Sequence, residues 1–248
     1  MSQAEAIYAL WFREFKVFTR EKSRIVTSIV NPLLWIFVFG GGLGSAVDIS
    51  GINYQVFVYP GILGMTVLFS SVFYGTYIIW DRKIDILKEV LVAPLPRTSI
   101  FIGKVLGGCT DSMIQAFVML LISFAVGVHL TIPAFLSAIL ILFLLSLSLV
   151  SAGLIIGSLM ESPEGFNMIV SFLVFPLFFF SGALYPLDNL PVWLAAITYI
   201  DPVTYGVDAL RTVTIGISRF PLYFDLAVLA VFAGVMFTIG TRSFERMT

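Results

Sequence analysis

Long apolar stretches, separated by short charged or Pro- and Gly-containing breaks, dominate the chain. Between Ser112 and Met160 no residue is Asp, Glu, Lys or Arg. A soluble core of this size could not bury so long an uncharged stretch. A bilayer can, because a helix needs roughly 20 apolar residues to cross the hydrocarbon layer. The pattern therefore predicts a protein of the lipid bilayer.

Six apolar stretches are long enough to span the membrane. The long uncharged stretch is read as two spans because Gly127 and Pro133 interrupt it, and Pro133 suits the first turn of a helix. The predicted spans are 25–44, 56–80, 105–128, 134–160, 166–184 and 222–241. We therefore expect an all-α integral membrane protein with six transmembrane helices in a single transmembrane domain over 1–248.

Composition agrees with this class, and the placement of charge gives the orientation. Only 12% of residues are charged, against about 25% in soluble domains. Most Lys and Arg residues precede the first span, separate the second from the third, or follow the last: Arg13, Lys16, Arg20, Lys22, Arg24, Arg82, Lys83, Lys88, Arg97, Lys104, Arg242 and Arg246. Arg211 and Arg219 alone fall on the other side. Because cytoplasmic loops are rich in basic residues, both termini are predicted to face the cytoplasm.

The N-terminal segment 1–24 has the pattern of an amphipathic helix. Its apolar residues recur at helical spacing against a polar set of Arg13, Glu14, Lys16 and Arg20. The apolar set is Ile7, Leu10, Trp11, Phe15 and Phe18. This predicts a helix lying in the inner membrane interface, and the alternative is a basic anchor that only sets orientation. The next apolar stretch is longer than a signal-peptide core, so we expect it to be retained.

Several kinds of chemistry are missing from the sequence. No phosphate-binding loop with Lys followed by Ser or Thr is present, since the glycine run at 40–45 lacks a Lys. One histidine, His129, and one cysteine, Cys109, are too few for a metal cluster or a disulfide framework. The sequence therefore predicts no enzyme activity, no metal and no cofactor in this chain.

Ion-coupled carriers hold their coupling ion on ionisable groups near the bilayer midplane. In the predicted spans, Asp111 and Asp225 are the acidic candidates, and each stands near the end of its span. We expect both to remain hydrated. The sequence thus indicates a conduit that takes its energy from elsewhere.

Segment 81–104, between the second and third spans, is predicted to contain a short amphipathic helix on the cytoplasmic side. Ile84, Leu87, Lys88 and Leu91 share one face of this helix. Arg82, Asp85 and Glu89 lie toward another face, and Pro94 ends the helix. Such a helix can lie on lipid or dock into a partner's groove, and the residues alone leave both open.

Segment 185–221, between the fifth and sixth spans, is too broken by proline to be a span and too apolar to be a solvated loop. Short helices that re-enter the outer leaflet fit both facts, provided that protein buries their irregular backbone. We expect four charged residues at the outer surface: Asp188, Asp201, Asp208 and Arg211.

Motifs in these two segments and in the fifth span resemble those of the type-2 ATP-binding-cassette (ABC) exporter permeases, nearest to the daunorubicin-resistance and nodulation-factor export branches. The motifs are KEVLVAPLPR at 88–97 with GK at 103–104, FP at 175–176, SGALYPL at 181–187, LP at 190–191, DPVTY at 201–205 and DALR at 208–211. The resemblance covers essentially the whole chain. It implies a permease subunit of an ATP-driven exporter in a prokaryotic cell (inner) membrane. It also implies a second permease subunit, identical or related, and two separate cytoplasmic ATPase subunits that hold ATP-Mg.

The resemblance also implies two sets of site residues. Ile84, Leu87, Lys88, Glu89 and Leu91 would couple the chain to the ATPase. The pathway between two permease subunits would be lined by the first, second and fifth spans, with Asn31, Thr66, Phe69, Ser70, Phe73, Phe178 and Phe179 as candidates. Ordinary packing is the alternative for each of these seven.

Hydroxyl and aromatic groups without charge suit an amphipathic or lipid-linked cargo such as a drug, a glycolipid or a polysaccharide. Membrane lipids are expected partners and nucleic acid is not. The rival reading is an ATP-independent channel or a structural subunit of a membrane complex. Two small-residue pairs, Gly103 with Gly107 and Gly153 with Gly157, let helices approach closely. We expect them to pack inside the bundle, with a dimer contact as the alternative.

Overall fold

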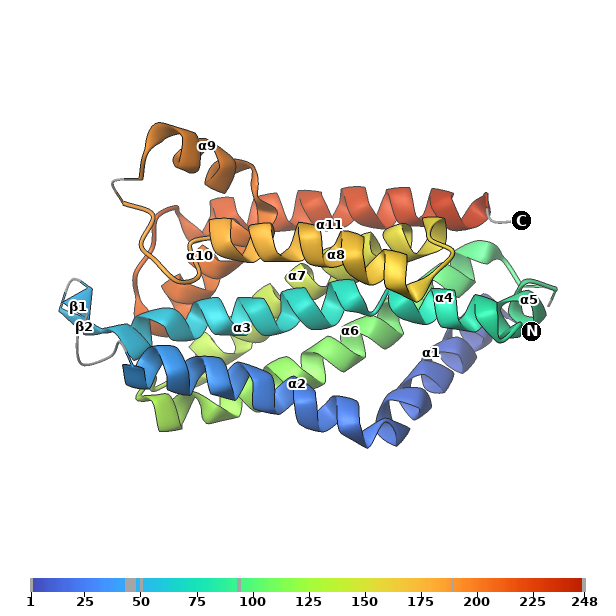
Figure 1. Ribbon diagram of the computed structural model, residues 1–248, viewed down its shortest axis with the longest axis horizontal. Coiled ribbons are helices and arrows are strands. Elements are labelled where there is room, and N and C mark those ends of the chain that lie inside the picture. The colour runs from blue at the N-terminus through green and yellow to red at the C-terminus, as the bar shows by residue number, and fades with distance from the viewer. Residues whose placement is uncertain (1, 43–47, 50, 93–94, 189, 247–248) are drawn as a thin grey trace.

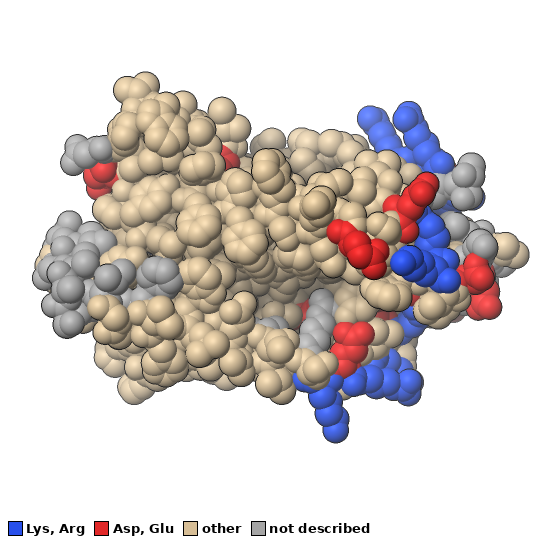
Figure 2. Space-filling model, in the orientation of Figure 1, with Lys and Arg blue, Asp and Glu red and all other residues tan. Residues whose placement is uncertain are grey.

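The computed structural model describes residues 2–42, 48–49, 51–92, 95–188 and 190–246, and it is an elongated bundle of helices (Figure 1). The N-terminal helix α1 begins and the C-terminal helix α11 ends at the same end of the bundle (Figure 1). Lys and Arg side chains gather at this end, while the middle of the visible face is uncharged (Figure 2). We call this end the inner end and the opposite one the outer end.

In the described part of the chain, five helical segments are long and apolar enough to cross a membrane. They are α3 (Tyr54–Phe73) with α4 (Thr76–Lys83), α6 (Arg97–Ile122) with the 3-10 turn η2 (Ser123–Val126), α7 (Ile132–Leu159), α8 (Pro163–Phe180) and α11 (Leu222–Glu245). An all-α integral membrane fold is thus confirmed. Pro133 lies in the first turn of α7, as expected, and Thr131 caps that helix.

Among the described residues, the first predicted span has a shorter apolar helix than the other five. It consists of α2 (Lys22–Trp35) and a π-helical segment η1 (Ile36–Gly41), and its apolar part is Ile25–Val38. The last two residues of this predicted span, 43 and 44, lie outside the described residues. A small antiparallel strand pair, β1 (Asp48–Ile49) and β2 (Ile52–Asn53), precedes α3. A sixth crossing therefore stays a prediction.

Helix α1 (Gln3–Arg20) packs along α6 rather than standing apart from the bundle. Its buried face carries Ala6, Leu10, Glu14 and Phe18, and the indole of Trp11 donates a hydrogen bond to Thr110 of α6 at 2.9 Å. The assignment of Glu14 to the polar face was wrong. Residues four apart lie on one side of a helix, so Glu14 falls between Leu10 and Phe18 on the buried side.

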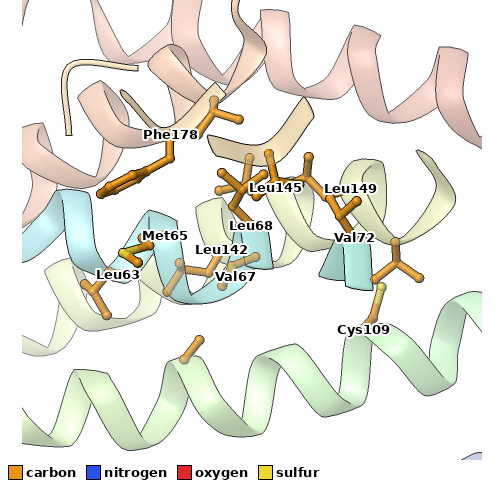
Figure 3. Close-up of a cluster of buried hydrophobic side chains, with 14 of the residues drawn as sticks. Leu63, Met65, Val67, Leu68, Val72, Cys109, Leu142, Leu145, Leu149 and Phe178 are labelled. Carbon is orange, nitrogen blue, oxygen red and sulfur yellow. The ribbon is translucent and has the colours of Figure 1, made fainter. Parts of the chain in front are cut away.

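The two glycine pairs let helices touch within the chain, which confirms the internal reading. A Cβ atom on Gly103 or Gly107 would come within 2.6 Å of Cβ of Leu10 or Glu14 on α1. On α7, a Cβ atom on Gly153 or on Gly157 would lie 2.4 Å or 2.3 Å from a backbone oxygen of the α3–α4 segment. Figure 3 shows the core beside these contacts, where Leu68 and Val72 of α3 meet Leu145 and Leu149 of α7.

The outer segment folds into two short helices, α9 (Val192–Ile200) and α10 (Pro202–Ile215). Helix α10 is buried against α3, α7 and α11, whereas α9 stands out from the bundle with Trp193 exposed (Figure 1). Short helices were expected here, but three of the four charged residues expected at the outer surface were not placed correctly. Asp201, Asp208 and Arg211 are buried, and Asp188 is exposed as predicted.

Candidate functional site: coupling segment, inner ion cluster and cavity

The predicted coupling helix is shorter than the sequence pattern suggested. Helix α5 spans Ile86–Val92, and Ile84 lies outside it as the C-cap of α4. Asp85 separates the two helices with a φ of 58°, in the left-handed region. Ile84 therefore does not share a helical face with Leu87, which corrects that expectation.

The side chains of α5 divide into a buried anchor and exposed groups. Leu87 is buried within the chain, while Glu89 and Val92 are exposed. The side chains of Lys88 and Leu91, like residues 93–94, lie outside those that the structure describes. Leu87 thus holds α5 against the chain itself, and Glu89 and Val92 are the described groups on α5 that a partner could contact.

Four charged side chains, which we name the inner ion cluster, meet between α1, α4 and α6 near α5. They are Arg13, Glu14, Asp81 and Lys104. The ammonium of Lys104 lies 3.1 Å from Glu14 and 2.5 Å from Asp81, and the Arg13 guanidinium binds both oxygens of Asp81 at 2.5 and 3.1 Å. The hydroxyl of Tyr74 donates to Glu14 at 2.9 Å. Residues far apart in the sequence are thereby tied together.

Charge balance explains why the inner ion cluster can be buried. Two cations face two anions, and Lys104 is only 2% exposed. Removing charges from water costs several kcal/mol per ion unless each one is paired and hydrogen-bonded. Burial lowers the pKa of Arg13, but the hydrogen bond and charge of Asp81 outweigh it and hold that pKa above its ordinary value. One sequence signal for this cluster was missed. Glu14 lies four residues from both Leu10 and Phe18, and this spacing places it on the buried face of α1.

Five of the seven predicted pathway residues line one cavity of about 500 Å³ between α2 and α3. They are Asn31, Thr66, Phe69, Ser70 and Phe73. The other lining residues, not identified from the sequence, are Thr27, Val30, Pro32, Leu34, Met65 and Gln115. The hydroxyls of Thr66 and Ser70 donate to backbone carbonyls one turn back, so their oxygens retain acceptor capacity toward the cavity.

The two remaining pathway candidates lie on α8 and do not line this cavity. Phe178 is buried behind it, with its ring edge-on to Trp35 at 5.9 Å and to Phe69 at 6.4 Å, and Figure 3 shows it pointing toward α3. Phe179 is 45% exposed. Phe178 therefore supports the aromatic wall, and Phe179 faces outward in a single chain.

The two acidic residues of the spans are buried, contrary to the expectation that both stay hydrated. Asp111 is 2% exposed and accepts a 2.7 Å hydrogen bond from Gln115, which lines the cavity. Asp225 is 0% exposed in the first turn of α11. Both residues stand where helices pack against one another, and proximity to a span end did not guarantee contact with water. Among the described residues, no group of three or more His, Cys, Asp or Glu side chains could hold a metal ion.

Two buried charges at the outer end, Asp208 and Arg211, bond to backbone groups. Asp208 accepts hydrogen bonds from the amides of Arg219 and Phe220 at 2.8–3.0 Å. Arg211 donates to the carbonyl of Gly182 at 2.9 Å and stacks 4.2 Å from the ring centre of Phe57. Burial lowers the pKa of Arg211 to about 10, although the charge of Asp208 opposes this. These contacts fold the connecting loops onto α10.

Five apolar spans, a cavity of neutral polar and aromatic groups and a basic inner end define a multi-pass membrane permease. The ABC-2 type transporter family model matches residues 5–215, and the chain belongs to that family. It is a transport subunit of the inner membrane, as its apolar helices and its relatives indicate.

Relatives cover most of the chain. It is 28% identical to the inner membrane transport permease YadH of Escherichia coli (strain K12), over 97% of this chain and 95% of that protein. It is 33% identical to the putative transport permease ycf38 of Cyanophora paradoxa, over 84% of this chain and 73% of that protein. Nodulation protein J of Rhizobium leguminosarum bv. viciae is 22% identical over 96% of this chain and 93% of its own. The resemblance to ABC exporter permeases is thus confirmed at the level of the family.

Proposed function

We propose that this chain is the permease subunit of an ATP-driven exporter that moves an amphipathic or lipid-linked cargo out of the cytoplasm. Two copies of a separate cytoplasmic ATPase would bind ATP-Mg and supply the energy. A second permease subunit, identical or related, would complete the pathway. Family membership supports the partnership, and the arrangement of the inner end supports the route by which energy enters the chain.

The observation that carries this proposal is the position of α5. It leaves Glu89 exposed at the inner end, is anchored by the buried Leu87, and follows directly on α4, which Asp81 ties to the inner ion cluster. A force on α5 therefore acts on α4 and, through the cluster, on α1 and α6. A free loop would absorb such a force instead.

The same segment continues to the cavity. Helix α4 joins α3 at Tyr74–Gly75, and Phe73, Ser70 and Thr66 of α3 form one wall of the cavity. The join lies against α7, where Gly157 gives room for the Gly75 carbonyl. Displacement of α4 can thus tilt the wall that faces the cargo without passing through a flexible linker.

The cavity also indicates the class of cargo. None of its lining residues is charged, and its aromatic groups are phenylalanines. Its amide and hydroxyl groups come from Asn31, Gln115, Thr27, Thr66 and Ser70. Such a surface binds apolar groups and neutral polar groups together. A drug, a glycolipid or a lipid-linked polysaccharide fits that description.

We further propose six crossings, with α2 and η1 as the first, and both termini in the cytoplasm. Two observations support this topology: α1 begins and α11 ends at the same end of the bundle, and that end is basic (Figures 1 and 2).

The topology can be tested by cysteine labelling. In a Cys109→Ala background, Asp85→Cys should react only with membrane-permeant thiol reagents in intact cells. Val192 is an exposed residue of the outer segment, and Val192→Cys should react with impermeant reagents. Labelling of both sites from outside would refute this topology.

ATP dependence can be tested in inside-out vesicles that contain both subunits, with a fluorescent amphipathic tracer that the wild-type complex accumulates. Uptake should disappear with a hydrolysis-dead ATPase and survive an uncoupler at constant ATP. Loss of uptake with the uncoupler would show ion coupling. Uptake through the purified chain alone would favour the channel reading.

A further inference from the structure

A groove of about 710 Å³ opens at the inner end between α7 and α11, and no residue of the cavity or of the inner ion cluster lines it. Its lining comes from the ends of three helices: Arg82, Ile155, Ser158, Leu159, Ile239, Arg242, Ser243 and Arg246. The proposed function uses none of these residues. The groove therefore needs its own explanation.

The polar side of the groove carries three arginines, Arg82, Arg242 and Arg246, and no carboxylate lines it. The nearest acids in the sequence are Asp81, Glu161 and Glu245, and none of them belongs to the lining. Like charges that converge on one space repel one another, and a bound anion removes that repulsion. This side is built for negative charge.

Arg82 is fixed in place rather than free to move in solvent. Its guanidinium donates to the carbonyls of Ser158 and Met160 at the end of α7, each at 2.9 Å. The hydroxyls of Ser158 and Ser243 lie 3.0 Å apart and join α7 to α11 beside it. Arg242 and Arg246, one turn apart on the other side, are exposed. One arginine is thus preorganised, and two can close over a ligand.

The remaining side of the groove is apolar and faces outward. Leu159 is 69% exposed and Ile239 is 45% exposed, and both belong to helices that span the membrane. At the basic end of a membrane bundle, such side chains lie against lipid tails and the adjacent arginines lie at the level of the headgroups. A free phosphate or an acidic protein segment would leave this apolar wall without a partner.

We propose that this groove binds an anionic phospholipid of the cytoplasmic leaflet, with its phosphate among the three arginines and an acyl chain along Leu159 and Ile239. Basic pockets between transmembrane helices on the cytoplasmic side suit such headgroups. Because Arg82 directly follows Asp81, the bound lipid rests against the segment that carries the inner ion cluster.

The test measures binding of phosphatidylglycerol to the purified chain by native mass spectrometry in mild detergent. The variant Arg242→Gln with Arg246→Gln removes two exposed groove charges, and Arg20→Gln with Lys22→Gln removes two exposed charges outside the groove. Each basic residue near an anionic membrane surface contributes about 1 kcal/mol, so the groove variant should bind about 30-fold more weakly. The control variant should stay within about twofold of the wild type.

Two further arms identify the ligand. Phosphatidylcholine should not be retained, and inorganic phosphate at equal concentration should not displace phosphatidylglycerol. Equal weakening in both variants would show a general charge effect and overturn the site. Displacement by inorganic phosphate, or equal retention of phosphatidylcholine, would overturn the phospholipid as its ligand.

Discussion

The two ends of the bundle both bury charged side chains, but they satisfy them in different ways. At the inner end, Lys104 joins Glu14 and Asp81, which come from two other helices. At the outer end, Asp208 and Arg211 bond to backbone groups of the loops beside α10. Side chains thus link helices at one end and shape connections at the other.

The difference bears on how each end can work. A buried ion pair is weak evidence for stability, because desolvation offsets its attraction, but breaking it leaves an uncompensated charge. The inner ion cluster therefore favours one arrangement of α1, α4 and α6 over every arrangement that separates the charges. The outer contacts of Asp208 and Arg211 instead hold connecting loops against α10. We infer that force is transmitted at the inner end.

Breaking the inner ion cluster should have the largest effect on the free energy of unfolding. Lys104→Ala leaves two carboxylates without their buried cation, and we expect it to lower the free energy of unfolding by about 4 kcal/mol. Denaturant titration in mixed micelles measures this change. Lys22→Ala, an exposed site at the same end, should change it by less than about 0.5 kcal/mol. If both variants were equally stable, the cluster would not join the helices.

Breaking an outer contact should cost less, because backbone groups near the surface can find water. Asp208→Ala removes the acceptor for the amides of Arg219 and Phe220, with an expected loss of about 2 kcal/mol. Asp188→Ala removes an exposed partner of Arg219 and should cost less than about 0.5 kcal/mol. The same titration compares them. A cost for Asp208→Ala above that of Lys104→Ala would reverse the comparison.

The smallest expected effect is a dependence of folding stability on pH, caused by a buried carboxyl group at the outer end. Burial raises the pKa of Asp201 to about 7, although the hydrogen bond from the Val203 amide opposes this. The folded chain thus holds this proton more tightly than the unfolded one, so stability falls as pH rises toward and through 7. We expect a loss on the order of 1 kcal/mol between pH 6 and pH 8.

Asp201→Asn keeps the capping oxygen and removes the titration. Thermal unfolding across this pH range should therefore be flatter in Asp201→Asn than in the wild type. Identical pH profiles in the two proteins would show that Asp201 does not carry the dependence.

The sequence predicted the membrane class and the long spans because hydrophobic length is a local property. Pro133 marked the start of α7 correctly, and the glycine pairs predicted close helix contacts. Short helices were predicted less well. Ile84 was placed on α5 by periodicity, but Asp85 interrupts the helix in a conformation that periodicity does not reveal.

The sequence could not show which side chains from different helices contact one another. Nothing in the local pattern shows that Glu14 meets Lys104, because the two belong to helices brought together by tertiary packing. The cavity was anticipated better, since Thr66, Phe69, Ser70 and Phe73 follow one another on a single helix. Its other lining residues, such as Gln115 from α6, depend on how helices assemble.

The most direct test of the account is whether the ATPase acts on α5. Complexes of the chain with its ATPase subunit would be purified and reconstituted in nanodiscs, and ATPase recovery and vanadate-sensitive ATP hydrolysis would be measured. Glu89→Arg reverses an exposed charge on α5, and Glu161→Arg reverses one in the other inner loop, between α7 and α8. The account predicts at least about a tenfold loss of ATPase binding for Glu89→Arg and wild-type behaviour for Glu161→Arg. Wild-type recovery and hydrolysis with Glu89→Arg would contradict it.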